Sequence, residues 1–147
     1  MTIHLTDYSL FKKQPSTYPI AHMLQRAAFS HTFTTAFTAA SDILEIGVFP
    51  ARAKACRATL IGEGLGAITA DVGFMTGDIG SKDAGRTSDD VLFDGVSVND
   101  EETEANVLTL MAIEAAETDR AVGVKFSGDI AAGASKKVHV VLEYFYD

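Results

Sequence analysis

The sequence predicts an all-β protein, an antiparallel β-sandwich of about eight strands that most resembles a jelly roll. The first observation is that apolar and polar residues repeat with a period of two. In several short stretches aromatic and β-branched residues alternate with polar ones, as in strands that bury one face. The second observation is that turn signals rich in glycine, proline and aspartate recur along the chain. Such a pattern is typical of sandwiches and barrels, and not of folds in which strands alternate with helices.

The chain is long enough for one domain. Its 147 residues have a hydrophobic fraction of 47%, which is enough for a substantial core. Residues 1–26 have weak periodicity and contain Pro15 and Pro19, so we expect them to form an extended N-terminal arm. Residues 27–147 are expected to form the sandwich.

The first predicted strand covers 29–37. Alternation places one set of its residues on a single face, namely Phe29, His31, Phe33, Thr35 and Phe37. A short apolar strand is predicted at 43–48. Pro50 ends it, because proline cannot donate a hydrogen bond to a β-ladder.

A third strand is predicted at 53–61, with two sets of residues on opposite faces. One set is Ala53, Ala55 and Arg57, and the other is Cys56, Ala58 and Leu60. A return strand follows at 67–75, and then a long polar, glycine-rich loop at 76–90. Short strand fragments are expected at 91–93 and 95–98.

The stretch 107–113 is ambiguous. Alanine, leucine, methionine and glutamate surround it, and on propensity alone they suit a helix over 102–116. A compact apolar run between charged clusters equally suits a buried strand. We favour the strand, because the neighbouring elements are strands and a lone helix would interrupt a sandwich.

The last predicted elements are strands at 122–126 and 136–146, joined as a β-hairpin by a small-residue loop at 127–135. The final strand has an unusually regular apolar face. We expect it to lie in the middle of a sheet, beside the first strand, and to bury Val138, Val140, Leu142 and Tyr144.

Charge is unevenly distributed along the chain. The net charge is −8, and the stretch 71–120 alone has 13 acidic against 3 basic residues. Residues 1–26 carry a net charge of +2. An acidic body repels phosphate backbones, so no nucleic-acid partner is expected. The sequence has no membrane-spanning run and no signal peptide, so we expect no membrane partner and synthesis in a cytoplasm.

No motif in the sequence indicates catalysis. The four histidines lack the spacing of a metal site, and Cys56 has no adjacent base, which makes a small buried core residue the preferred interpretation. The glycine-rich segments at 62–66 and 76–80 do not open a helix, as a phosphate-binding loop would. The acidic loop 78–90 does not match the spacing of an EF-hand. We therefore expect a protein without catalytic residues, metal or cofactor.

Three stretches carry a resemblance to a known class of protein: FTAASDILEIGVFPARAKACRATLI, ITADVGFMTGDIG and TDRAVGVKFSGDIAAGASKKVHVVLEYFY. Over about 33–146 the chain resembles small virion proteins of tailed bacteriophages, of the capsid decoration or cement type. The resemblance implies a β-sandwich or jelly-roll protein without enzymatic activity, assembled as a homotrimer. It also implies a place on the outer surface of the head, with the major capsid protein as partner.

A decoration protein needs a segment that binds the capsid shell, and the N-terminal arm is suited to this role. Aromatic side chains and prolines in an extended segment can add a strand to a neighbour or fill its pockets. The residues predicted to contact the partner are Leu10, Phe11, Lys12, Lys13, Pro15, Tyr18 and Ile20.

Other functions remain open at this point. A head–tail connector or tail component of the virion would have the same sequence properties. A carbohydrate-binding jelly-roll module of a head fibre is a further alternative, although the absence of tryptophan disfavours it. A small cupin-like metalloenzyme is a third, although the paired-histidine signature of that class is missing.

Overall fold

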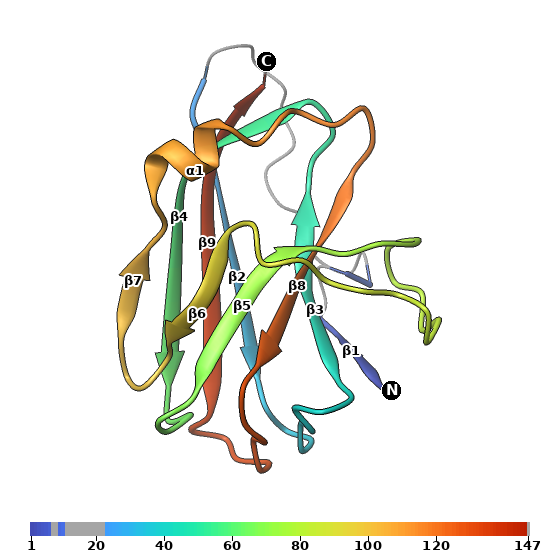
Figure 1. The fold of residues 1–147 in the computed structure, drawn as a ribbon, viewed down its shortest axis with the longest axis vertical. Coiled ribbons are helices and arrows are strands. Elements are labelled where there is room, and N and C mark those ends of the chain that lie inside the picture. Colours follow the sequence, from blue (N-terminus) through green and yellow to red (C-terminus); the bar gives the residue numbers. More distant parts are fainter. Residues whose placement is uncertain (7–8, 11–22, 147) are drawn as a thin grey trace.

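The computed structural model describes residues 1–6, 9–10 and 23–146. Two β-sheets pack face to face, as the sequence predicted, and one short helix lies at one end (Figure 1). The elements are β1 Ile3–Leu5, β2 Gln25–Thr32, β3 Ile43–Phe49, β4 Ala53–Glu63, β5 Thr69–Phe74, β6 Phe93–Ser97, β7 Glu102–Glu104, α1 Val107–Met111, β8 Arg120–Phe126 and β9 Lys137–Tyr146.

The strand order is that of a jelly roll with one added strand. Sheet A has the order β1-β3-β8-β5-β6, and sheet B has the order β2-β9-β4-β7. The eight strands β2 to β9 fill two four-stranded sheets, and most connections cross from one sheet to the other. The added strand is β1, which pairs with β3 in parallel. It lies within the segment predicted to be an arm, so Ile3–Leu5 belongs to the sandwich.

The last strand lies in the middle of sheet B, as predicted. β9 pairs antiparallel with β2 on one side and with β4 on the other. Its inward side chains are at most 1% exposed, and they are the four that alternation assigned to the core: Val138, Val140, Leu142 and Tyr144. A fully buried aliphatic or aromatic side chain contributes about 1.5–3 kcal/mol, so this strand is a main support of the core.

The predicted hairpin of the last two strands is wrong. β8 belongs to sheet A, between β3 and β5, whereas β9 belongs to sheet B. The small-residue loop between them crosses from one sheet to the other, and Ile130 in this loop forms a bridge with Phe37. Both strands alternate regularly, but alternation does not tell which strand each one pairs with.

The strand predicted over 107–113 is also wrong. Residues Val107–Met111 form helix α1, with the side chain of Asn106 as its N-cap, accepting a hydrogen bond from the N–H of Leu108 at 2.9 Å. Local helix propensity prevails here because the segment lies at one end of the sandwich. It is therefore not required to complete a sheet.

A β-bulge changes the predicted faces of β4. Pairing with β9 shifts register between Ala55 and Arg57. Ala55 and Ala58 therefore both face the core, while Arg57 is exposed. Cys56, at the bulge, is half-buried rather than a core residue.

One glycine is required where the two sheets touch. A Cβ atom at Gly47 of β3 would lie 2.5 Å from a ring carbon of Phe29 in β2. Any larger residue would push these strands apart. Phe33, Phe37 and Phe126 continue this part of the core with edge-to-face ring contacts, at centroid distances between 5.3 and 6.0 Å.

Candidate assembly surface

The predicted partner residues lie mostly outside the described part of the chain. Leu10 is described, and its side chain is 43% exposed. The other predicted contacts are outside the described residues, and they are Phe11, Lys12, Lys13, Pro15, Tyr18 and Ile20. Their role stays a prediction.

The segment that leads into Leu10 is fastened to β3 by polar contacts. The hydroxyl of Thr6 donates to the carbonyl of Ile46 at 2.6 Å, and the hydroxyl of Ser9 donates to the carbonyl of Glu45 at 3.0 Å. Both side chains are buried. These bonds satisfy backbone groups at the irregularity in β3 between Glu45 and Gly47.

A buried ion pair lies at the same place. The carboxylate of Glu45, fully buried in β3, pairs with the guanidinium of Arg86 in the 76–90 loop. The N–H of Gly80 also donates to this carboxylate, at 2.9 Å. Arg86 donates further to the carbonyls of Thr76 at 2.8 Å and Ser81 at 2.7 Å. The pair therefore fixes the long loop against the base of the arm.

Sequence reasoning missed this pair. The loop 76–90 was interpreted as a polar connection, whereas Arg86 is one of its most buried residues. The available signal was Glu45 itself, an acid within an apolar strand. Such a residue is expected to have a buried partner, but nothing in the sequence identifies Arg86 as that partner.

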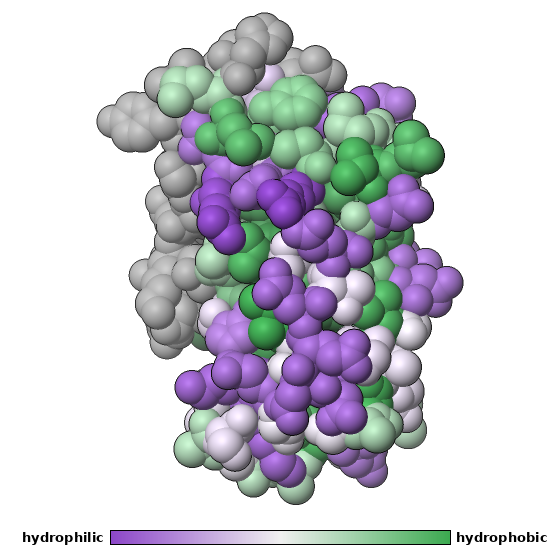
Figure 2. Space-filling model, turned by 90° about the vertical axis from the view of Figure 1, so that its left-hand side faces the viewer, coloured by the Kyte–Doolittle hydropathy of each residue, from purple (hydrophilic) through white to green (hydrophobic). Residues whose placement is uncertain are grey.

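Exposed large apolar side chains form two groups. In the described part of the chain they are Met1, Leu10, Met23, Leu24, Val107, Leu108 and Met111. Leu10, Met23 and Leu24 lie within the predicted arm, on either side of 11–22 in the sequence. The others, apart from Met1, belong to α1. Figure 2 shows apolar side chains toward the upper end of the molecule and polar ones over the middle.

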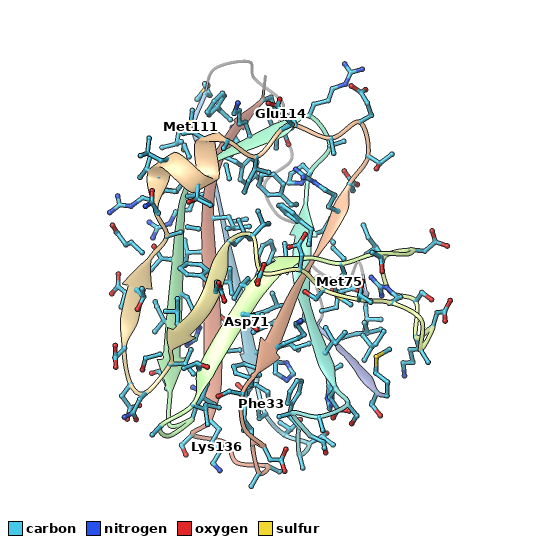
Figure 3. The ribbon with its side chains drawn as sticks, in the orientation of Figure 1. Phe33, Asp71, Met75, Met111, Glu114 and Lys136 are labelled. Carbon is cyan, nitrogen blue, oxygen red and sulfur yellow. The ribbon has the colours of Figure 1, made fainter. Side chains whose placement is uncertain are left out.

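Helix α1 exposes most of its apolar side chains. Leu108 is 82% exposed and Val107 56%, while Leu110 is fully buried against the core. Figure 3 shows Met111 at the same end of the molecule as Glu114, far from Phe33 and Lys136. Exposed aliphatic side chains grouped on one turn of helix are typical of a protein contact rather than of a solvated surface.

The outer face of sheet B contains a hydrogen-bonded histidine. His139 lies between Ser30, 2.7 Å from its Nδ1, and Glu63, 2.6 Å from its Nε2. These are residue types of a catalytic triad, but they lie on the three neighbouring strands β2, β9 and β4, and Ser30 is the direct ladder partner of His139. The arrangement is therefore a polar contact across the strands of the sheet.

The thiol of Cys56 is not activated. Burial, followed by the charge of Glu143, raises the pKa of the Cys56 thiol, which keeps it protonated and poorly nucleophilic. The described residues contain no group of three or more side chains suited to a metal ion. A polar hollow of about 180 Å³ on sheet B is lined by Arg26, Arg57 and Glu143 among others, and Arg57 is already paired with Glu104. No helix in the described ranges has the length and hydrophobicity to cross a membrane.

Solved structures that resemble this chain include two from phage capsids. A chain from the capsid of Ralstonia phage GP4 superposes with a TM-score of 0.89 at 29% sequence identity, over 99% of this chain and 98% of that one. A chain of the cyanophage Pam1 capsid asymmetric unit gives a TM-score of 0.59 at 19% identity, over 92% and 93% of the two chains, which shows a shared fold. No family model matches the sequence, and no curated protein is significantly similar to it. The likeness to the phage GP4 chain supports a structural protein of a phage capsid.

Proposed function

We propose that this protein decorates the outside of a tailed-phage head, where it binds the major capsid protein and stabilises the shell without catalysing a reaction. The observation that carries the proposal is the likeness to a chain of the Ralstonia phage GP4 capsid, at 29% identity over nearly the full length of both chains. Agreement over the whole length favours the same kind of assembly role, because the match includes loops and edges as well as the core.

The charge distribution supports a place outside the shell. A net charge of −8 would be repelled by packaged nucleic acid on the inside. On the outside the same acidic surface is solvated. The rigid sandwich supplies the body of a decorating protein, and Leu10, Met23 and Leu24 are exposed apolar residues of the arm that are available for contact.

In this role the arm binds the shell, and Lys12 and Lys13 supply its positive charge. A trimer would hold the shell through three arms at once. Multivalent binding of this kind converts weak single contacts into a high overall avidity. The experiment therefore measures binding to whole heads.

The test mixes purified protein with heads that lack it and measures co-sedimentation, together with the temperature at which the heads release DNA. We expect saturable binding and a higher release temperature. Replacing Lys12 and Lys13 by alanine should weaken binding, whereas the matched loss of Lys82 and Lys136 outside the arm should not. Heads that neither bind the protein nor gain heat resistance would refute the decoration role.

A further inference from the structure

A second, thinner layer covers part of the outer face of sheet A. It consists of residues 1–6 and 9–10 together with the 76–90 loop, which runs across β8 and β3 toward β1 (Figure 1). We term these segments the covering layer. Between it and the sheet lies a small apolar cluster, separate from the main core, that contains Ile3, Leu5, Ile43, Met75, Ile79 and Ala121.

The two segments of the covering layer contact each other directly. Leu5 from β1 and Ile79 from the loop pack against the same buried cluster. A Cβ atom at Gly80 would lie 3.3 Å from the carbonyl oxygen of Ser9, so the two backbones approach closely there. Displacement of either segment therefore uncovers the other.

Glu45 of β3 binds both segments. Its carbonyl oxygen accepts from the N–H of Thr6 at 3.2 Å and from the hydroxyl of Ser9 at 3.0 Å. Its carboxylate accepts from the N–H of Gly80 at 2.9 Å and pairs with Arg86. The backbone of one residue thus holds the base of the arm, and its side chain holds the loop.

The covering layer is held less firmly than the strands of the sandwich. Within the described part of the chain Nη2 of Arg86 is buried without a hydrogen-bond partner, and an unsatisfied buried donor disfavours the closed arrangement. A hollow of about 320 Å³ is lined by 39–43 on one side and 84–88 on the other, so this part of the loop is incompletely packed. Segments with few buried apolar contacts open at a lower free energy than core strands do.

We propose that the covering layer opens from sheet A as a single unit while the sandwich of β2 to β9 stays folded, and that the pair of Glu45 with Arg86 holds it closed. Opening frees the base of the arm, because Thr6 and Ser9 then lose their acceptors on β3. The two segments are therefore coupled. A change that loosens the loop loosens the arm, and by reciprocity a change at the arm loosens the loop to the same degree.

This conformational step goes beyond the proposed function and does not depend on it. It is tested on the protein alone, so its failure leaves the head-binding result unaffected. Hydrogen exchange followed by mass spectrometry, over a series of low denaturant concentrations, gives the opening free energy of each segment. We expect residues 2–6 and 76–88 to share one opening free energy, and β9 to have a clearly higher one.

The key variant is Thr6→Val combined with Ser9→Ala. It removes the two side-chain hydrogen bonds between the base of the arm and β3 and alters no residue of the loop. We expect amide exchange in 76–88 to become about tenfold faster, because the loss of two buried hydrogen bonds favours the open layer. Exchange in β9 should keep its rate, which shows that the sandwich of the variant is folded.

The matched control is Ser30→Ala, which removes a hydroxyl contact on sheet B and should leave exchange in both segments unchanged. Three results would overturn the inference. In the first, the double variant speeds exchange in residues 2–6 alone, so the two segments open independently. In the second, the loop of the unchanged protein exchanges as slowly as β9, so the layer is part of the cooperative unit of the sandwich. In the third, β9 loses protection together with the layer.

Discussion

The last strand and the first strand are attached to the sandwich in different ways. β9 has ten residues, is paired on both sides and buries one complete face. β1 has three residues, and within the described part of the chain it pairs with β3 alone. It is fastened by the burial of Ile3 in a small apolar cluster and by Asp42, which accepts from the N–H of Thr2 at 3.2 Å and lies 2.9 Å from Nε2 of His4. A complete apolar face holds the central strand, whereas one buried side chain and a few polar contacts hold the edge strand.

Removing β9 should give the largest effect. Truncation before Val138 exposes the inner faces of β2 and β4, so we expect a chain that does not fold. Leu142→Ala is the milder form and should lower the free energy of unfolding by about 2–5 kcal/mol in chemical denaturation. Val141→Ala, on the outer face of the same strand, is the matched control and should cost clearly less. A truncated chain with native circular dichroism would show that β9 is peripheral.

The base of the arm should be sensitive to the charge at Glu45. Glu45→Gln leaves the buried guanidinium of Arg86 without its counter-ion, which should cost about 3–5 kcal/mol of unfolding free energy. The double variant Glu45→Leu with Arg86→Met removes both charges and should recover most of the loss. Hydrogen exchange should localise the change to 76–90 and to the segment beside β3. Equal stability of Glu45→Gln and the unchanged protein would contradict a structural role for the pair.

Acid should weaken the edge where β1 and β2 lie. Burial, followed by the nearby charge of His4, lowers the pKa of His31 from 6.5 to about 4. Between these values the unfolded chain binds more protons than the folded one, so stability falls as the pH drops from about 6.5 to 4 and then levels off. The melting temperature should follow this window.

His31→Gln should flatten that part of the profile. The pKa of Asp42 gives a separate signal at lower pH: burial alone would raise it, but hydrogen bonds from Thr38, His4 and Ser41 outweigh this and lower it below 3.8. The stability that Asp42 contributes is lost only as the pH falls through this lowered value. An unchanged slope between pH 6.5 and 4 in His31→Gln would show that another group titrates there.

The sequence correctly predicted features that depend on a local residue pattern, such as where a strand lies and which of its faces is buried. The period of two in 136–146 identified β9, its buried face and its central place, because a sheet with one buried face requires that alternation. It did not predict that β8 and β9 lie in different sheets, because alternation is the same for either partner. The face assignment of β4 failed at Cys56 for a related reason: one extra residue at a bulge reverses the parity without leaving a sequence signal.

The candidate surface was predictable only in part. The arm was predicted from its prolines and aromatic residues, and most of it lies outside the described residues, so it stays a prediction. The exposed face of α1 was missed because its apolar residues looked like those of a buried strand, and exposure depends on where the chain places them. The pairing of Glu45 with Arg86 spans 41 residues. Contacts at such separation depend on the finished topology and not on local composition.

The central position of β9 has a consequence for how the chain reaches its native state. β2 and β4 are both synthesised well before Lys137–Tyr146, and each needs that segment as its neighbour in sheet B. Until it leaves the ribosome, two long strands have unpaired sides, and the aromatic residues of the core are uncovered. Non-local pairing of this kind folds slowly and exposes intermediates to aggregation. Sheet B can therefore form only after Lys137–Tyr146 has been synthesised.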